Sequence, residues 1–508
     1  MPQYDTYDVI IVGSGSGGAA LAGRLAEKGI NPKTGDRLRI ALLEGGSYIF
    51  KGGKMAPGLG DAQRRKMITN VIYDETKLEQ WPYDGMQNRM VGGCSVHWGG
   101  NSYFPFPEDY KLYQEETDLK DWTQQNFKEA VEEVRQWYHV HPMPEEYLNK
   151  GNRMVRDVAL ALGYKPDSAS MARKNCLNCG FCGGGNLCKY DAKGTALPYI
   201  QLAEEHGVNL IPSAEVKKVI IEKQGAGGIA RGVVYEKGGQ LQEARADKII
   251  VACGTTGTPW LLYKSGYGPR ELLGDNTIVE NKNVGKNLDG DVSFSPQALF
   301  PEDIKEADRG GVADIEFVLD TPRIRNGVQI FGYDMSGFCH FNYPWAIALN
   351  QFAPEFGWEH KNFMRKGTRR IGALTVRVQG LEWSKGHVSK EGRHVYDRTH
   401  PAVIKSVLRG REVVLEMFNR MNPKPLKVDT RVPKTFEISH EVGTCRIGKR
   451  PESSVVNEQF ESHEVKNLII GSGAVVPKSG HSHSAIPIAV VAAFEWRSLV
   501  RNFFSRGA

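Results

Sequence analysis

Residues 7–29 have the sequence YDVIIVGSGSGGAALAGRLAEKG, and this stretch decides the fold. Residues 7–12 are mostly β-branched, which is typical of a buried strand. Glycines follow, and then an alanine-rich segment that predicts a helix ending at Gly29. RIALLE at residues 39–44 predicts the next buried strand, and the polar segment before it predicts a loop. The order strand, helix, strand predicts a βαβ unit.

The glycines of this stretch have the G-x-G-x-x-G spacing at Gly13, Gly15 and Gly18. Gly13 permits a tight turn, Gly15 lets a pyrophosphate approach the backbone, and Gly18 lets helix and strand pack closely. The helix N-terminus then favours the phosphate charge. Glu44 ends the second strand and can accept hydrogen bonds from a ribose diol. The pattern predicts a dinucleotide site, with a glycine turn that binds no nucleotide as the alternative, and it does not separate FAD from NAD.

Length and composition narrow the class of protein. A chain of 508 residues suggests two intimately connected domains. The net charge of +6 is small for this length, and the absence of a basic run argues against nucleic acid as a partner. The sequence contains no stretch of about 18 apolar residues, so we expect no transmembrane segment. The N-terminus lacks the features of a signal peptide, so we expect a cytoplasmic protein, with export attached to a partner as the alternative.

Further landmarks recur along the chain and resemble those of the glucose–methanol–choline (GMC) oxidoreductases, which are FAD-dependent alcohol oxidases and dehydrogenases. Within that family, the sequence most resembles the pyranose oxidases and the FAD sugar dehydrogenases. The landmarks are VIIVGSGSGGAALAGRLAE at 9–27, VGGCSVHWGG at 91–100, VACGTTGTPWLL at 251–262, VGKNLDGD at 284–291, HEVGTCRIG at 440–448 and NLIIGSGAVVPKSGHSHS at 467–484.

The resemblance implies an α/β fold (α+β overall), with a Rossmann-type FAD-binding domain and a substrate domain built on a mainly antiparallel sheet backed by helices. We expect a discontinuous FAD-binding domain from residues 1–105, 190–294 and 436–508. Residues 106–189 and 295–435 then form the substrate-binding domain with its Cys-rich loop.

The resemblance also implies a pair of catalytic histidines. Alcohol oxidation needs a base for the hydroxyl proton, and histidine suits this because its pKa is near neutral. The family places one histidine in an HxxGTC-type segment, here His440, and a companion before a C-terminal apolar helix, here His483. We expect His440 to be the base and His483 to position the substrate oxygen and stabilise developing charge. His481 lies close enough in sequence to exchange roles with His483, and a packed or capping residue is the plain alternative for each.

The segment at 91–100 bears on the flavin itself. In pyranose 2-oxidase and choline oxidase, the histidine of a similar Gly-Gly segment bonds covalently to the flavin 8α-methyl group. His97 occupies that place, but relatives with noncovalent flavin also have it, so both modes of binding stay open. We expect Gly93, Cys94, Trp98 and Asn101 to line the same loop.

Two weaker cofactor contacts follow from the resemblance. Val216 matches a strand position whose backbone meets adenine, and Gly473 lies in the last landmark. Ser472 stands where many family members have an aspartate.

Four cysteines crowd into a glycine-rich stretch with the pattern C-x-x-C-x-x-C-x5-C. Close thiolates of this kind can bind an Fe–S cluster or zinc. Some GMC dehydrogenases have a 3Fe–4S cluster in a corresponding loop, with different spacing, whereas the long-chain alcohol oxidases have similar Cys-Gly loops without one. We favour a structural role for these thiols over metal binding, and both interpretations stay open. The four are Cys176, Cys179, Cys182 and Cys188.

The aromatic-rich region at 330–358 suits sugar rings, and also a sterol or aryl alcohol, although core packing is the commoner reason for such residues. We expect oxidation of a sugar or glycoside, with a sterol, aryl or long-chain alcohol as the alternative. O₂ or an electron-acceptor partner then takes the electrons; an Fe–S cluster would indicate a dehydrogenase. A flavoprotein of another class is the third hypothesis. The aromatics are Phe331, Tyr333, Phe338, Phe341, Tyr343, Trp345, Phe352 and Trp358.

Overall fold

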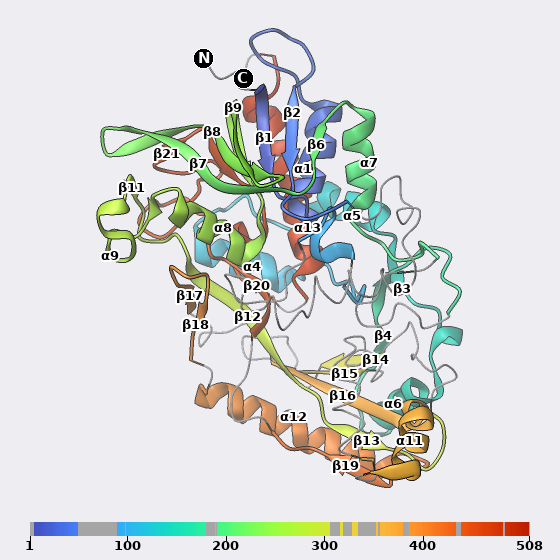
Figure 1. Ribbon diagram of the computed structural model, residues 1–508. Helices are drawn as coiled ribbons and strands as arrows, with labels where there is room; N and C mark the ends of the chain where they lie inside the picture. The colour runs from blue at the N-terminus through green and yellow to red at the C-terminus, as the bar shows by residue number, and fades with distance from the viewer. Residues whose placement is uncertain are drawn as a thin grey trace.

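The computed structural model contains two large sheets at opposite ends of the molecule (Figure 1). It describes residues 5–48, 89–96, 98–178, 188, 190–304, 315–318, 328–333, 352–353, 356–378, 386–397, 399–432, 438–480 and 483–506.

The first sheet is built around the βαβ unit that opens the chain. Its strand order is β21-β8-β9-β1-β2-β6, with β22 beside β9 and β7 beside β8. β1 pairs in parallel with both β2 and β9, and β2 pairs in parallel with β6, as the buried apolar runs predict. The strands are β1 (Asp5–Val12), β2 (Ile40–Leu43), β6 (Asn209–Ile211), β7 (Ala214–Gln224), β8 (Gly227–Lys237), β9 (Gln240–Val251), β21 (Val465–Lys466) and β22 (Leu468–Ile470).

Helices from both ends of the chain pack beside this sheet. α1 (Ser16–Lys28) and α13 (Ala485–Phe503) contact each other, so the first and last helices of the described chain lie together (Figure 1). Small residues on α1 permit close packing: a methyl group on Gly23 would lie 2.6 Å from a backbone oxygen of α7 (Leu197–Glu205). The neighbouring helices are α4 (Pro107–Thr117), α5 (Lys128–Trp137) and α8 (Gly254–Lys264).

The second sheet is antiparallel in every pairing that the structure describes, in agreement with the predicted fold class. Its order is β18-β17-β12-β16-β15-β14-β4, with β13 beside β16 and β19, and β20 beside β12. The strands are β4 (Asp167–Ser168), β12 (Lys286–Phe294), β13 (Gln297–Leu299), β14 (Ile315–Val318), β15 (Val328–Tyr333), β16 (Ile371–Val378), β17 (Gly386–Val388), β18 (His394–Val395), β19 (Lys427–Asp429) and β20 (Ile438–Val442).

Helices α6 (Lys150–Ala161) and α12 (Pro401–Arg420) contact the second sheet, and α12 runs along the bottom of the view in Figure 1. Shorter elements complete the described parts; the domain boundaries expected from the sequence stay a prediction. These elements are α9 (Arg270–Leu273), α11 (Gly357–Lys366), β3 (Val140–Pro142), β5 (Ser170–Ala172), β10 (Tyr267–Gly268), β11 (Val279–Glu280) and the 3₁₀ turns η2 (Gly93–Val96), η3 (Glu145–Tyr147), η5 (Gly274–Asn276), η7 (Gly367–Arg370) and η9 (Gly473–Val475).

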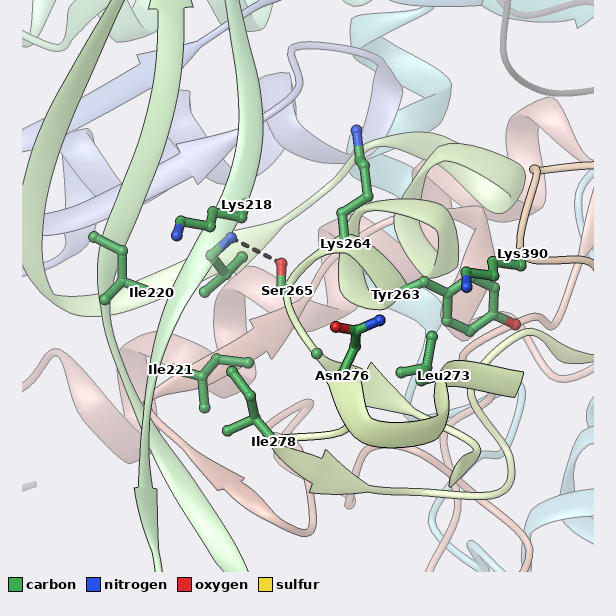
Figure 2. A pocket seen from close by; sticks show the side chains of 12 residues that line it. Lys218, Ile220, Ile221, Tyr263, Lys264, Ser265, Leu273, Asn276, Ile278 and Lys390 are labelled. Atoms are coloured by element: carbon green, nitrogen blue, oxygen red, sulfur yellow. Dashed lines mark hydrogen bonds between the residues drawn. The ribbon is translucent and has the colours of Figure 1, made fainter. Parts of the chain in front are cut away.

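A surface hollow of about 440 Å³ lies beside β7, α8 and α9 (Figure 2). The Val219 amide donates to Ser265 Oγ at 2.8 Å in its wall. The ammonium group of Lys264 points away from those of Lys218 and Lys390 in Figure 2, so the three charges do not converge on one point. None of its lining residues belongs to the histidine segments of the predicted site.

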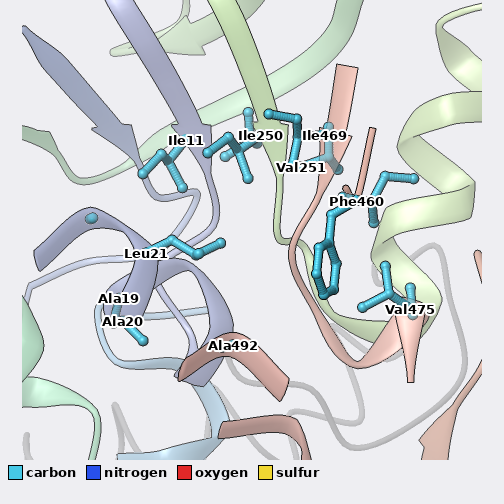
Figure 3. Close-up of a cluster of buried hydrophobic side chains, with 14 of the residues drawn as sticks. Ile11, Ala19, Ala20, Leu21, Ile250, Val251, Phe460, Ile469, Val475 and Ala492 are labelled. Atoms are coloured by element: carbon cyan, nitrogen blue, oxygen red, sulfur yellow. The ribbon is translucent and has the colours of Figure 1, made fainter. Parts of the chain in front are cut away.

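The larger hydrophobic core joins the first sheet to α1 and α13. In Figure 3, Ile11, Ile250 and Ile469 extend from three strands toward Leu21 of α1, and Ala492 of α13 lies close by. All but Ala492 are fully buried, and Ala492 is 2% exposed. The core therefore binds the two chain termini into one layer that supports the glycine turn.

Candidate active site

The glycine turn between β1 and α1 has the tight geometry that its spacing predicts. Gly13 adopts φ +95°, which L-residues rarely adopt, and a methyl group there would lie 2.5 Å from the Ala252 carbonyl oxygen. A methyl group on Gly18 would overlap the Gly13 carbonyl. The turn therefore brings α1 against both β1 and the end of β9.

Gly15 and Gly93 together leave open space at the N-terminus of α1. Gly15 caps the helix without a side-chain hydrogen bond, and a methyl group on it would meet only the Gly93 α-carbon, at 4.0 Å. The first N–H groups of a helix attract anions. A cradle lined by backbone, which a side chain would fill, fits the pyrophosphate of a dinucleotide.

Glu44 lies at the carboxyl end of β2, next to this cradle, as the pattern predicts. Its carboxylate accepts hydrogen bonds from Ser14 N at 3.0 Å, Ser14 Oγ at 2.7 Å and Gly46 N at 2.8 Å. Burial raises the pKa of Glu44 and outweighs these hydrogen bonds, which lower it. A carboxylate has about four acceptor positions, so the group retains capacity for a ribose hydroxyl.

His440 and His483 lie together, although 42 residues separate them in the sequence numbering. Their ring centroids are 4.4 Å apart and the rings meet edge to face at 77°. His440 belongs to β20 and adopts φ +58°, an uncommon backbone conformation that is often found at functional sites. His483 directly precedes the N-cap of α13 and stacks on Tyr103 at 5.3 Å. The structure thus brings together the two histidines that the resemblance selects.

A buried ion pair that sequence reasoning missed lies against both histidines. Asp291 on β12 and Arg377 on β16 are 0% and 1% exposed at the side chain. The Arg377 guanidinium binds Asp291 Oδ2, and its Nη1 lies 3.4 Å from His483 Nδ1. His440 Nδ1 lies 2.9 Å from Asp291 Oδ2.

Sheet register explains why these residues meet. Asp291 pairs with Ser439 on β20, and Arg377 pairs with Ser293 on β12. Residues two apart on a strand share a face, so Asp291 and Arg377 lie on the same face of the sheet. Asp291 lies in the quoted VGKNLDGD landmark, but Arg377 lies in the central region, where no motif distinguishes it.

Two basic side chains donate hydrogen bonds to carbonyl groups of the loop after η2. Lys193 Nζ donates to the Trp98 carbonyl at 2.8 Å, and Arg173 donates to the Gly99 carbonyl at 2.7 Å. Trp98 Nε1 donates to Gly194 O at 2.9 Å. Asn101 forms an isolated antiparallel β-bridge with Met171. Cys94 is exposed in η2 beside Gly93. His97, the residue that would bond to the flavin if the attachment is covalent, lies outside the described residues.

The other residues predicted to lie near the cofactor are on β7 and around η9. Val216 is 8% exposed on β7. Gly473 in η9 accepts a backbone hydrogen bond from Gly443 at 3.1 Å, which connects it to the HEVGTC segment. Ser472, in the place of the family aspartate, accepts from Ala474 N at 3.1 Å and caps this turn.

Half of the cysteine motif and most of the aromatic region are outside the described residues, as are His481, Cys179 and Cys182. Ala192 N donates to Cys188 Sγ at 3.1 Å. No group of three or more possible metal ligands gathers within the described ranges. Phe352 is buried, whereas Trp358 is 75% exposed, so Trp358 does not line an enclosed site.

Comparison with known proteins identifies the family. A family profile described as GMC oxidoreductase matches residues 7–291, and a second with the same description matches residues 387–492. The chain belongs to the GMC oxidoreductase family.

Curated relatives are distant. A long-chain-alcohol oxidase of Arabidopsis thaliana is 24% identical over 92% of this chain and 65% of the relative. A cholesterol oxidase of Mycobacterium tuberculosis is 27% identical over 51% of this chain and 48% of the relative. The chain thus spans about two thirds or less of the length of these relatives.

Solved structures share the fold across nearly the whole chain. Pyridoxine 4-oxidase superposes with a TM-score of 0.69 at 15% identity, covering 96% of this chain and 98% of that one. Formate oxidase superposes with a TM-score of 0.70 at 14% identity, covering 98% and 99%. Within the described parts, no helix is both long and apolar enough to cross a bilayer.

Proposed function

We propose that this protein oxidises an alcohol to a carbonyl with bound FAD, using His440 as the base and His483 as a hydrogen-bond donor to the substrate oxygen. The observation that supports this most directly is the 4.4 Å contact between the two rings. Two imidazoles so placed can both reach one hydroxyl group, and histidine is the commonest general base near neutral pH.

The residues divide the work of the reaction. The O–H bond breaks as its proton moves to His440, the C–H bond breaks as its electron pair leaves with the hydride, and the C=O bond forms. When bound, FAD supplies the two-electron acceptor for that hydride. His483 binds the oxygen throughout and stabilises the negative charge that develops on it. The Gly15 cradle and Glu44 are suited to bind the pyrophosphate and ribose.

We favour an apolar alcohol as the substrate. The long-chain-alcohol and cholesterol oxidases found among the relatives support this choice over a sugar. Trp358, one of the aromatics considered for a sugar platform, is largely exposed. The sugar or glycoside substrate expected from the sequence stays a prediction, and glucose represents it in the substrate panel below.

The test compares histidine variants on a substrate panel. Turnover of 1-dodecanol, cholesterol in detergent and glucose would be measured with O₂ and with a dye acceptor. His440→Ala should lower kcat by about 10²- to 10⁴-fold with unchanged FAD content. His387→Ala, an exposed histidine on β17, is the matched control and should keep full activity. An active His440→Ala enzyme would refute the mechanism, and a preference for glucose would refute the apolar substrate.

The state of the flavin and the cysteines can be read from the same preparation. We expect the yellow colour to enter the supernatant on acid precipitation if FAD is noncovalent, and to stay in the pellet if His97 bonds to it. Iron analysis separates structural thiols from an Fe–S cluster, which would favour an electron-acceptor partner over O₂.

A further inference from the structure

The buried pair of Asp291 and Arg377 contacts both histidines, but with groups of opposite hydrogen-bonding character. A carboxylate only accepts hydrogen bonds, and a guanidinium only donates them. Asp291 faces Nδ1 of His440 at 2.9 Å, and Arg377 faces Nδ1 of His483 at 3.4 Å. The same ring atom of the two histidines therefore meets an acceptor in one case and a donor in the other.

Burial and neighbouring charges define the protonation states of Asp291 and His483. Burial acts to raise the pKa of Asp291, but Arg377 and His440 outweigh it and lower that pKa far below its usual range. Asp291 is therefore a carboxylate, and Ser439 Oγ also donates to it, at 2.7 Å. Burial, followed by the electrostatic effects of Arg377 and His440, lowers the pKa of His483 well below its usual value, although Asp291 acts to raise it. His483 is therefore neutral.

These contacts determine where the ring protons lie. Facing a carboxylate, His440 must have its proton on Nδ1, so the Nε2 of the neutral ring is unprotonated. Facing a guanidinium, the neutral His483 must accept at Nδ1, so its proton lies on Nε2. Which nitrogen of a histidine is protonated is set by the hydrogen bond that the other nitrogen makes.

We propose that Asp291 and Arg377 are positioning residues that give His440 and His483 opposite tautomers, so that one ring presents a proton acceptor and the other a proton donor to the same alcohol oxygen. The proposal rests on the proposed function, because it takes that alcohol as the group between the rings. The O–H proton then moves to His440 Nε2, while His483 Nε2–H remains hydrogen-bonded to the oxygen.

The ion pair also keeps the net charge next to the two histidines close to zero, because the charges of Asp291 and Arg377 cancel. Without Arg377, the Asp291 carboxylate would favour the doubly protonated form of His440, which cannot act as a base. Without Asp291, Arg377 would be a buried cation beside two imidazoles, and His440 would lose the partner of its Nδ1–H. Among the described residues, the charged and titratable groups that contact the two rings or the ion pair are Asp291 on β12, Arg377 on β16, His440 on β20, His483 before α13, and Tyr103 stacked on His483.

The direct test is ¹⁵N NMR of FAD-loaded protein labelled at the histidine ring nitrogens. His440→Gln and His483→Gln assign the two spin systems by loss of their signals. The expected result is His440 protonated on Nδ1 and His483 protonated on Nε2. The opposite tautomer on either ring would overturn the proposal. Because this readout needs no turnover, it stands or fails separately from the activity of His440→Ala.

A variant series tests the pair itself. Asp291→Asn should lower kcat by about 10²- to 10⁴-fold, the range of general-base catalysis. Arg377→Met should move the acidic fall of kcat/KM to higher pH, and Arg377→Lys should restore the wild-type profile, because an ammonium still neutralises the carboxylate. Arg370→Met is the control: it removes an exposed pairing with Asp303 at 3.3 Å, just before the start of β16. It should change neither kcat nor the pH dependence of kcat/KM.

Loss of folding in the single variants would not end the test. The double variant Asp291→Asn/Arg377→Met removes both buried charges at once, so no uncompensated charge remains. It should fold, bind FAD and lose activity to the extent of Asp291→Asn. A double variant with kcat within about threefold of the wild type would refute the positioning role.

Discussion

Gly15 and Gly93 contact each other through their backbones, and only one of them has room for a side chain. A methyl group on Gly93 would lie 2.7 Å from the Gly15 α-carbon, and Gly93 also adopts φ +54°. A methyl group on Gly15 would meet nothing closer than the Gly93 α-carbon at 4.0 Å. The two glycines therefore serve different purposes: Gly93 permits the contact, and Gly15 leaves the space open.

Gly15→Ala should weaken FAD binding by tenfold or more, about 1.4 kcal/mol, without changing the stability of the apoprotein. The added methyl group occupies the cradle that the pyrophosphate would enter, but it strains nothing in the protein itself. A flavin fluorescence titration measures the affinity, and thermal unfolding measures the stability. Tight FAD binding by Gly15→Ala would contradict this location for the pyrophosphate.

Gly93→Ala should instead destabilise the apoprotein, by about 1–3 kcal/mol, because both its backbone conformation and the Gly15 contact oppose a side chain. Gly207→Ala is the matched control, because Gly207 adopts φ +82° with nothing within 4 Å. It isolates the cost of backbone conformation, about 1 kcal/mol. Equal losses of stability in Gly93→Ala and Gly207→Ala would show that the close contact between Gly93 and Gly15 does not affect the free energy of unfolding.

Glu133 connects four helices through one carboxylate. It is 5% exposed on α5 and accepts from Arg24 of α1 at 2.7 Å, Tyr199 of α7 at 3.0 Å, and Trp496 and Arg497 of α13 at 3.1 and 2.7 Å. Glu133→Ala should lower the free energy of unfolding by about 3 kcal/mol, because the guanidinium groups lose a mostly buried partner.

The control for Glu133 lies one residue away on the same helix. Glu132 has a side chain that is 55% exposed and pairs with Arg135 at 3.5 Å. Glu132→Ala should therefore change the stability by less than about 1 kcal/mol. Chemical denaturation of both variants measures the difference, and equal losses would show that the carboxylate of Glu133 does not join the helices.

Glu495 predicts a pH dependence of stability. Its carboxyl group is fully buried on α13 and makes no hydrogen bond within the described parts of the chain. Burial raises the pKa of Glu495 well above its ordinary value of 4.5. The folded protein therefore retains a proton that the unfolded chain has lost, so this group's contribution to stability is fully present at acidic pH and declines as pH rises above 4.5.

Glu495→Gln should remove this loss. Relative to the variant, the wild type should lose up to about 1.4 kcal/mol of stability per pH unit between the unfolded and folded pKa values. Thermal unfolding at pH values below and above the pKa of a free glutamate checks the slope. Glu452→Gln, at an exposed position, should show no such slope. A pH-independent difference between the wild type and Glu495→Gln would contradict the raised pKa of Glu495 in the folded protein.

Local patterns were sufficient for the elements near the chain ends. Residues 7–12 and 39–44 were predicted as buried strands around a glycine turn, and β1, α1 and β2 occur there in parallel pairing. The C-terminal apolar helix that the resemblance implies after His483 occurs as α13. Such elements are predictable because burial, periodicity and glycine conformation act over a few neighbouring residues.

The proposed catalytic centre could be predicted only in part from the sequence. His440 and His483 were selected by their flanking residues, but nothing nearby in the sequence indicates that Asp291 and Arg377 lie against them. Asp291 lies 149 residues before His440, and Arg377 lies in a region without recognisable motifs.

The sequence by itself therefore determined the βαβ nucleotide fold, the family and the identity of the histidine pair, because these depend on short patterns of residues. Only the tertiary structure decided that an acceptor faces one histidine and a donor faces the other. That decision depends on the antiparallel register of β12 with β16 and β20, which places side chains from distant segments on one face. Register between distant strands results from the packing of the whole sheet, and no local pattern of residues encodes it.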